Sequence, residues 1–596
     1  MTHSIQRPSA AARDSRLCVL KFGSSVLRAP EDYAKAAHEI YRHTRAGEKV
    51  IAVVSALEGE TDDLFAIGDA VGQGMADHLV ARLVRTGELK SAALLGLALE
   101  RSGIPAAVLD PHEMDLVAEG EALDANLVSL DAHRVLKHLE AADVIIAPGF
   151  FGESLNGPAT LGRGGTDLTA IMFAHWLGAS RARLIKDVDG VYSADPRDVP
   201  DAERLDQLDY IEAAKVSRGL VQEKAIFAAR DLGVIIEIAA IGRGYATRIG
   251  PDTHVPGCVR KPSPLRIAVL GHGSVGAGLC TYLLDQPEQF VLNPVLVRDP
   301  ARHQLDSHPG LVFTAHAEEA LADDPDIIVE TIGGISLARS LSQSVLRDGA
   351  HLVTANKAVI ARDIDLLAEL AKESNCQLRY SAAVGGGVPI LETLDRLTAQ
   401  SGVLAVEGVI NGTCNFIFSR LRQGIAFDEA VIEAQKAGFA EADPSTDLDG
   451  HDVADKLSII SRHAFGIGLD PASIPKESLS DLSAARIKSV NQQGLLFKQV
   501  GSCAVTRDGR IEAKVEIRAI LPNHPFAGLE NEQNGFLIRT PQGEVEIRGK
   551  GAGRWPTAEA VFADIMDIQR HITANNRSIT RPNPVQTRSR PGITPA

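Results

Sequence analysis

Three absences narrow what this chain can be. Its six cysteines (positions 18, 258, 280, 376, 414 and 503) form no CxxC pair, so neither a disulfide framework nor a zinc site is indicated. The formal net charge of −16 leaves no basic surplus for phosphate backbones, which argues against nucleic acid as a partner. No apolar run reaches the length of a membrane span, and no apolar signal segment precedes the first strand pattern. We therefore expect a soluble, cytoplasmic protein that acts on small molecules.

The 596 residues are too many for one hydrophobic core, and about three domains are expected. A hydrophobic content of 45% with 53 glycines is typical of α/β domains. The polar ends, residues 1–16 and 574–596, have too little apolar surface to offset the entropy of ordering and are predicted to be disordered. The proline-rich stretch 251–264 is the predicted linker between two halves.

The first half, residues 17–250, opens with a strand pattern that brings Lys21 into the loop Gly23–Ser25. This loop could cradle a phosphate, but a strand that simply ends in a turn explains it equally well. A stronger signal is Leu161–Asp167 (LGRGGTD), whose glycines would present backbone N–H groups to an anion at the start of a helix over 168–177. A further helix is expected to open at Thr86-Gly87-Glu88 and to run through Leu99.

In this order the segments resemble the amino-acid kinase fold, and specifically the catalytic part of aspartate kinase. KFGSSV, VVSA, TGELKSA, LGRGGTDLTA and KDVDGVYSADPR stand where the family has KFGGTSV, VVSA, a GE-containing helix, LGRGGSDTTA and TDVDGVYTADPR. The resemblance implies Mg-ATP as cofactor if the domain is active. It also implies a kinase-like site in which Lys21 stabilises the transferring phosphoryl group, Glu88, Arg163 and Asp167 hold aspartate, Asp189 and Arg197 lie near ATP, and Ser24 and Ser25 belong to the phosphate loop.

The first half departs from that family in three ways. Its first loop has one glycine fewer, the stretch Gly219–Lys224 (GLVQEK) replaces an AKVLHP-like segment, and no regulatory repeat follows. Two interpretations therefore stay open: a catalytic aspartate kinase domain, or a non-catalytic module kept for regulation or assembly.

The second half begins with the strand pattern Leu265–Leu270, then Gly271–Gly276 (GHGSVG) and a helix, which together form the dinucleotide-binding fingerprint. A second strand is expected over about 291–297, and Arg298-Asp299 follow it. An acid there favours NAD(H) through the ribose hydroxyl, whereas an arginine favours the 2′-phosphate of NADP(H). Because Arg298 comes directly off the strand, NADP(H) is the preferred cofactor and NAD(H) remains possible.

The stretch Gly438–Lys456 (GFAEADPSTDLDGHDVADK) surrounds one lysine with carboxylates. It should begin as a loop and become helical from about Asp449, which would put Asp449, Asp452 and Lys456 on one face. Such a group could hold a small zwitterion and donate a proton. The alternative is an exposed Asp–Lys pair one helical turn apart.

These motifs, together with ANKA (355–358), VGGGVPI (384–390), NGTCN (411–415) and GKGAG (549–553), resemble homoserine dehydrogenase over residues 265–570. The resemblance implies hydride exchange between a nicotinamide and L-aspartate 4-semialdehyde, giving L-homoserine. Lys456, the expected proton donor, and Lys357 would stand at the carbonyl oxygen. Glu441 and Asp452 would bind the substrate ammonium and fix Lys456, with Asp447 in support, and Asn411, Gly412 and Thr413 would line the junction of substrate and nicotinamide. The implied cofactor-binding residues are Gly271, Gly273, Ser274, Val275, Gly276, Arg298, Thr331, Gly333, Ala355, Asn356, Lys357, Gly551 and Ala552. Another dehydrogenase of amino-acid semialdehydes is the weaker alternative.

One departure concerns a monovalent cation. The family often has a glutamate where this chain has Ser381, so Val384 and Gly386 could offer carbonyl ligands but the side-chain ligand is missing.

The predicted fold class is α/β: an amino-acid-kinase-like domain (17–250), a Rossmann-type NAD(P)-binding domain (265–389, completed by 546–573) and an α+β catalytic and dimerisation domain (390–545). The segment after Gly549 is expected to complete the sheet of the Rossmann-type domain. The resemblance implies a homodimer or homotetramer, and no regulatory (ACT) domain is visible.

Overall fold

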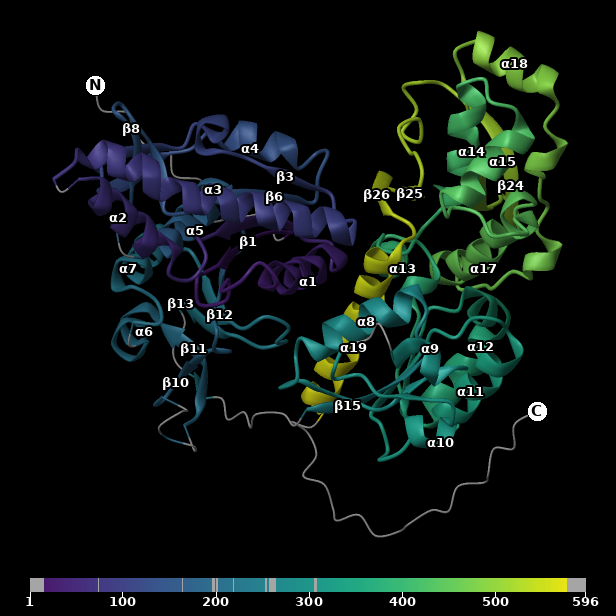
Figure 1. The fold of residues 1–596 in the computed structure, drawn as a ribbon, viewed down its shortest axis with the longest axis horizontal. Coiled ribbons are helices and arrows are strands. Elements are labelled where there is room, and N and C mark those ends of the chain that lie inside the picture. Colours follow the sequence, from purple (N-terminus) through teal and green to yellow (C-terminus); the bar gives the residue numbers. More distant parts are fainter. Residues whose placement is uncertain are drawn as a thin grey trace.

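The computed structural model describes residues 16–72, 74–162, 164–195, 199, 202–217, 219–251, 255–256, 264–304 and 308–575. These residues form two halves, 16–256 and 264–575, drawn on the left and right of Figure 1. Among the described helices, none has both the length and the apolar character that crossing a bilayer requires.

The first half is built on a ten-stranded sheet in the order β10-β11-β13-β12-β9-β1-β2-β6-β3, with β14 beside β11. Alternate residues of β1 explain why both faces are covered: Leu17 and Val19 join the core under α5, while Cys18, Leu20 and Phe22 join the core under α1 and α3. A small sheet, β5-β4-β7-β8, packs at one side. The strands are β1 Leu17–Phe22, β2 Lys49–Val54, β3 Ala106–Val108, β4 Val117–Glu121, β5 Asp124–Ser129, β6 Val144–Pro148, β7 Phe151–Ser154, β8 Gly157–Thr160, β9 Ala182–Ile185, β10 Val191–Tyr192, β11 Arg204–Asp209, β12 Ile236–Ala239, β13 Thr247–Gly250 and β14 Val255–Pro256. The helices are α1 Asp32–Arg45, α2 Glu60–Val71, α3 Asp77–Ser102, α4 Ala132–His138, α5 Gly165–Trp176, α6 Tyr210–Val216 and α7 Glu223–Leu232.

The second half starts with a parallel sheet in the order β18-β17-β15-β19-β20-β21, with β16 beside β15. Its strands are β15 Leu265–Leu270, β16 Phe290–Leu292, β17 Val295–Leu296, β18 Phe313–Thr314, β19 Ile327–Glu330, β20 His351–Thr354 and β21 Leu378–Arg379. Its helices are α8 Ser274–Leu284, α9 Pro300–Gln304, α10 Ala317–Ala320, α11 Ser336–Arg347 and α12 Lys357–Glu373. Helices on both faces of a parallel sheet make this the predicted Rossmann-type layer arrangement, with α11 and α12 in one core and α8 in the other.

A five-stranded antiparallel sheet, β24-β23-β22-β25-β26, follows and is packed against helices. Its strands are β22 Ala405–Val409, β23 Leu496–Val505, β24 Ile511–Ile520, β25 Gln533–Thr540 and β26 Gly543–Lys550. The helices of this part are α13 Ile390–Gln400, α14 Gly412–Arg422, α15 Phe427–Lys436, α16 Ser445–Leu448, α17 His451–Phe465, α18 Ala484–Gln492 and α19 Arg554–Asn575. The predicted strand over 511–520 is thus confirmed.

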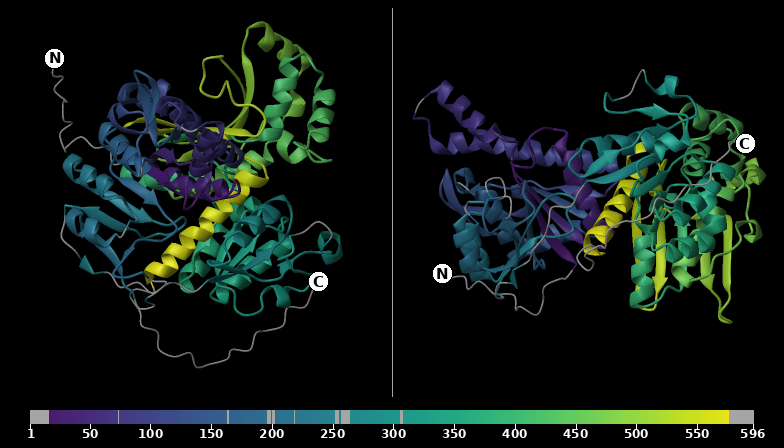
Figure 2. Two further views of the ribbon diagram at one scale, coloured as in Figure 1. Left: turned by 60° about the vertical axis from the view of Figure 1, so that its left-hand side comes forward. Right: turned by 90° about the horizontal axis from the view of Figure 1, so that it is seen from below.

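The last helix joins the two halves. Helix α19, the long yellow helix of Figures 1 and 2, packs on α8 and buries Val561, Phe562 and Ile565 in the core of the parallel sheet. It also contacts α1 and α3 of the first half. The expectation that the segment after Gly549 completes the Rossmann sheet was wrong, because residues up to Lys550 pair with β25 and the rest is helical.

Four local expectations need correction. Helix α3 runs from Asp77, so Glu88 lies in its middle and not at its start. The expected strand over 291–297 is divided into β16 and β17 around Asn293-Pro294, since proline offers no N–H to a ladder.

The short helix α16 replaces the loop expected before Asp449, and Gly450 (φ 75°) ends the run before α17 begins at His451. Within the predicted linker, Val255–Pro256 form β14, while the rest of that stretch, from 252, and the two predicted tails fall almost wholly outside the described residues.

Candidate functional site

A buried carboxylate organises the candidate site of the second half. Asp452, in the first turn of α17, is 3% exposed. Its Oδ2 accepts hydrogen bonds from Lys456 Nζ at 2.8 Å and Asn411 Nδ2 at 3.0 Å, and its Oδ1 lies 2.5 Å from Lys357 Nζ. Burial acts to raise the pKa of Asp452, but the two ammonium groups outweigh it and hold that pKa well below its usual range. A permanently charged carboxylate therefore fixes both lysines.

The two lysines come from different elements. Lys456 Nζ also donates to the carbonyl oxygen of Ile410 at 2.6 Å, so two of its three N–H groups are used. Lys357, the lysine of the ANKA motif that follows β20, is the first residue of α12, and its side chain is 38% exposed. Burial lowers the pKa of Lys357, whereas Asp452 raises it and prevails, so the group stays protonated. Two cations thus converge where the parallel sheet meets α17.

Asn411 links α14 to this group. It caps α14, with its Oδ1 accepting from the Cys414 N–H at 2.9 Å while its Nδ2 donates to Asp447 Oδ1 at 2.7 Å. Thr413 Oγ1 lies 3.0 Å from Asp447 Oδ2. Burial and the charge of Asp452 raise the pKa of Asp447, against the hydrogen bonds of Asn411 and Thr413. Four of the predicted residues, Asn411, Thr413, Asp447 and Asp452, are therefore in one network.

Two predicted residues stand apart from that network. Glu441 is exposed, and its backbone carbonyl, not its carboxylate, accepts a hydrogen bond from Gln435. Asp449 lies outside α17, from which Gly450 separates it, and its carboxylate accepts a hydrogen bond from the Ser478 hydroxyl at 2.5 Å. The expectation that Asp449 shares a helix face with Asp452 and Lys456 was wrong.

The dinucleotide fingerprint forms a tight turn that requires glycine at two positions. Gly271 has φ 106°, and a Cβ on Gly276 would lie 2.2 Å from the Gly271 carbonyl oxygen. A Cβ on Gly273 would meet nothing within 4 Å, so the backbone there is open to approach, and Ser274 and Val275 start α8. This geometry fits a pyrophosphate at the N-terminus of a helix.

The neighbouring loops are held by side chains that sequence reasoning missed. The buried carboxylate of Glu330 accepts from the N–H of Ile332 at 2.8 Å and the hydroxyl of Thr354 at 2.6 Å. The turn that contains Gly333 is thereby tied to the strand before Ala355, and Asn356 Nδ2 adds a bond to the Gly334 carbonyl at 2.7 Å. A glutamate at the end of a buried strand pattern was the signal available in the sequence.

The last two loops of the site touch each other. A Cβ on Gly386 would lie 2.4 Å from the Gly551 carbonyl oxygen, and the Gly387 N–H donates to the Lys550 carbonyl at 3.0 Å. Val384 is fully buried beside them. Gly551 and the glycine-rich loop are therefore packed against each other.

In the first half, a carboxylate again holds two lysines. Asp167, in the first turn of α5, lies 2.8 Å from Lys21 Nζ and 3.0 Å from Lys186 Nζ, and all three side chains are buried. Burial acts to raise the pKa of Asp167, but the lysines lower it. Sequence reasoning missed Lys186, although it directly precedes the Asp187–Gly190 segment.

The remaining predicted residues of that site are Glu88, Ser24, Ser25, Asp189, Arg163 and Arg197. Glu88 is buried next to Lys21, and burial raises its pKa to about 8, so the carboxyl is mostly protonated at neutral pH. Ser24 and Ser25 lie in the turn after β1, and Asp189 accepts a hydrogen bond from the Tyr192 hydroxyl at 2.6 Å. Arg163 and Arg197 lie outside the described residues.

Comparison with known proteins identifies the second half. The family model described as "Homoserine dehydrogenase, NAD binding domain" matches residues 271–381, and that described as "Homoserine dehydrogenase" matches residues 389–566. A homoserine dehydrogenase of Synechocystis is 35% identical over 327 residues, which span 53% of this chain and 75% of that protein. The chain belongs to the homoserine dehydrogenase family.

Other relatives agree. The homoserine dehydrogenase of Bacillus subtilis is 32% identical over 52% of this chain and 73% of its own length. The crystal structure of a homoserine dehydrogenase from Thiobacillus denitrificans superposes with a TM-score of 0.50 at 34% identity, covering 54% of this chain and 76% of that one. The first half matches the model described as "Amino acid kinase family" over residues 16–239. The predicted order, an amino-acid kinase domain followed by NAD-binding and homoserine dehydrogenase domains, is confirmed.

Proposed function

We propose that the network around Asp452 is the active site at which this homoserine dehydrogenase interconverts L-aspartate 4-semialdehyde and L-homoserine. The observation that carries the proposal is the pair of ammonium groups, Lys456 and Lys357, held by one buried carboxylate. When bound, the nicotinamide supplies the hydride that reaches the aldehyde carbon. Lys456 donates a proton to the carbonyl oxygen, while the charge of Lys357 stabilises the negative charge that grows there.

The other residues of the network position these groups. Asp452 and the Ile410 carbonyl hold Lys456, so a proton on Nζ is directed to one place. Asp447, Asn411, Gly412 and Thr413 line the substrate side, and Asp447 is the carboxylate left to meet the substrate ammonium. Asp452 already has three partners, so we propose that it positions the two lysines. Glu441 is exposed and would reach the substrate only if its segment closes over the site.

We further propose NADPH as the preferred cofactor. The carboxylate of Asp299 is engaged with the N–H groups of Ala301 at 3.1 Å and Arg302 at 3.4 Å at the start of α9. Arg298 is exposed, which leaves its guanidinium available for a 2′-phosphate. Val384 and Gly386 stay the proposed carbonyl ligands of a monovalent cation.

The test is NADPH oxidation by the full chain with L-aspartate 4-semialdehyde. We expect this aldehyde to be reduced in preference to other amino-acid semialdehydes, and NADPH to have a lower KM than NADH. Replacing Arg298 by alanine should remove the preference for NADPH while leaving kcat unchanged. Equal rates with another amino-acid semialdehyde would favour that class of dehydrogenase instead, and an unaltered NADPH preference would contradict the role of Arg298.

A second function rests on the first half. We propose that it transfers the γ-phosphoryl group of Mg-ATP to the side-chain carboxylate of aspartate, with Lys21 and Lys186 offsetting the charge on the transferring group. The supporting observation is the buried Lys21–Asp167–Lys186 group within a domain of the amino acid kinase family. The competing proposal is a non-catalytic regulatory or assembly module.

Aspartate-dependent release of ADP from Mg-ATP distinguishes these proposals. An active kinase should lose about 10²-fold or more in kcat when Lys21 is replaced by alanine, because a charge on the transferring group goes unmatched. Dehydrogenase activity of the same preparation serves as the control for folding. No ADP release above that of the Lys21→Ala variant, with aldehyde reduction intact, would sink the kinase proposal.

We propose that the domains have the limits given above and that α19 is the C-terminal part of the Rossmann domain. We also propose that the protein is a homodimer or a homotetramer. Analytical ultracentrifugation of the full chain would measure this oligomeric state.

A further inference from the structure

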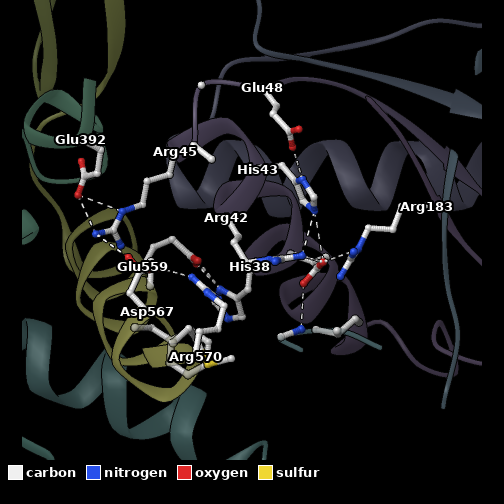
Figure 3. A pocket seen from close by; sticks show the side chains of 18 of the residues that line it. His38, Arg42, His43, Arg45, Glu48, Arg183, Glu392, Glu559, Asp567 and Arg570 are labelled. Atoms are coloured by element: carbon white, nitrogen blue, oxygen red, sulfur yellow. Dashed lines mark hydrogen bonds and ion pairs between the residues drawn. The ribbon is translucent and has the colours of Figure 1, made fainter. Parts of the chain in front are cut away.

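A cavity lies between the two halves. Its volume is about 830 Å³, within the range of small-molecule sites, and it is drawn in Figure 3. Helix α1 and strands β9 and β12 of the first half line one side, and α13 and α19 of the second half line the other. This cavity contains none of the residues assigned to either reaction.

The carboxylates of this cavity are already paired. Glu39 binds Arg42, and its other oxygen accepts the Gly242 N–H at 2.9 Å. Arg181 and Arg183 hold Glu237 at 3.1 and 2.9 Å. In the same way Glu48 pairs with Arg181 and His43, Glu392 and Asp567 pair with Arg45, and Glu559 pairs with His38 across the boundary between the halves.

The guanidinium groups, in contrast, have donors left over. Among the described residues that line this cavity, four buried guanidinium nitrogens make no hydrogen bond: Arg42 Nε, Arg45 Nη1, Arg570 Nη1 and Arg183 Nε, the last of which lies 3.5 Å from Glu39 Oε1. Each belongs to a side chain that already holds a carboxylate with its other nitrogens. An unpaired buried donor is costly, and native proteins rarely keep several in one place. The cavity is therefore short of acceptors.

Arg396 adds a fifth cation with no partner among the described residues. It projects from α13 onto Gly47 of the first half, where a Cβ would lie 2.2 Å from its Nη1. Burial lowers the pKa of Arg396, and the nearby Arg16 lowers it further. Burial has the same effect on Arg570, with Arg42 adding to it. In both cases burial and a neighbouring guanidinium outweigh the attraction of a carboxylate, which is Glu392 for Arg396 and Asp567 for Arg570.

We propose that this cavity binds a small multivalent oxyanion, a molecule with two or more carboxylate or phosphate groups. Its oxygens would accept the unused N–H groups of α1 and α19 and pair with Arg396. Carboxylates and phosphates match the fork of a guanidinium with two parallel hydrogen bonds, which a neutral ligand does not. Because the walls come from both halves, the bound anion would stabilise their docking.

A cation would fit the same cavity poorly. Cys18, His43 and Glu48 bring three possible metal ligands within 4.8 Å of one another. However, Arg181 holds both oxygens of Glu48 at 2.8 and 3.0 Å, and Arg42 lies 3.1 Å from His43 Nε2. A metal ion would have to displace or repel these guanidinium groups.

The ligand can influence the dehydrogenase through Arg45. This side chain also donates to Ser381 Oγ at 2.8 Å and to Glu392 at 3.0 Å. Ser381 begins the segment that leads to the glycine-rich loop packed on Gly551. An anion on Arg45 Nη1 would thus act on the segment that leads to these two packed loops.

The test is isothermal titration of the full chain, with NADP⁺ saturating, using four probes: inorganic phosphate, pyrophosphate, succinate and citrate. The phosphate and carboxylate arms distinguish the two sources of oxyanion. We expect binding of one multivalent probe per chain, weakened about tenfold to a hundredfold in Arg396→Gln. Arg396 is the variant of choice because no described carboxylate depends on it for pairing, so the fold should be retained.

The matched control is Arg347→Gln, which makes the same change on the exposed end of α11 and should bind the probe as tightly as the unaltered chain. The proposal fails if none of the probes binds more tightly than chloride at equal ionic strength. It also fails if a bound probe is held equally well by Arg396→Gln. Loss of binding in both variants would mean non-specific attraction and would equally overturn it.

Discussion

Replacing Lys456 by alanine is expected to lower kcat for the reduction of L-aspartate 4-semialdehyde by about 10²–10⁴-fold. Lys456 is the proposed source of the proton, and its Nζ is directed by Asp452 and the Ile410 carbonyl. The fold should be retained, because Asp452 keeps Lys357 at 2.5 Å as a partner and is not left as an unpaired buried charge. Steady-state NADPH oxidation measures the effect.

Two variants separate proton donation from charge. Lys456→Arg keeps a cation but transfers a proton poorly, since a guanidinium stays protonated. Its kcat should therefore stay as low as that of Lys456→Ala, while its KM should be close to that of the unaltered chain. Lys372→Ala, an exposed lysine of α12, should leave both constants unchanged. Full activity of Lys456→Arg would show that the residue supplies charge alone, and full activity of Lys456→Ala would contradict the proposed mechanism.

Replacing Arg45 by methionine is expected to lower the free energy of unfolding by about 3–5 kcal/mol, the usual cost of removing one partner of a buried ion pair. Arg45 extends from the end of α1 in the first half and is 5% exposed. It binds Asp564 of α19, which is fully buried, and lies 2.7 Å from Glu392 of α13. Methionine replaces the aliphatic part of the side chain but leaves these carboxylates without a cation.

The loss should depend on pH in a defined direction. Burial raises the pKa of Asp564 and Glu392 adds to this, while Arg45 opposes both, so removing the guanidinium raises that pKa further. A carboxyl with a raised folded-state pKa takes up a proton that the unfolded chain has released, and stability falls as pH rises through that interval. The deficit of Arg45→Met should therefore be smallest near about pH 4 and grow toward neutrality.

Urea denaturation followed by tryptophan fluorescence can measure this. The chain has two tryptophans. The guanidinium carbon of Arg101, in α3, lies 4.7 Å from the ring centroid of Trp555, in α19, so the fluorescence of Trp555 reports on the contact between the halves. A Trp176→Phe background isolates that signal. Arg45→Met combined with Asp564→Asn should recover part of the loss at neutral pH. A loss that is independent of pH, or no loss, would mean that the ion pair does not hold the halves together.

Much of the second half follows from local sequence pattern. The strand before Gly271, the tight turn and the helix after Gly273 depend on residues adjacent in the chain, and glycine is required there by a φ of 106° and by the approach of Gly276 to a carbonyl oxygen. The expected strand over 511–520 is likewise set by its own alternation of side chains. Local errors arose where a neighbouring segment decided the outcome, as for Gly543–Lys550, which pairs with β25 and not with the parallel sheet.

The motifs, the domain order and the residue types available to each site can be read from the amino-acid sequence. Which of these residues contact one another depends on the packing of the folded chain. Asp452 joins Lys357, 95 positions away in numbering, since α12 and α17 are packed together, and Lys186 reaches Asp167 because β9 and α5 are adjacent. Ser381 stands where the family often has a glutamate that binds a monovalent cation. In this chain its hydroxyl accepts a hydrogen bond from Arg45 of the other half. Such pairings depend on packing between segments far apart in the chain, and no local pattern encodes them.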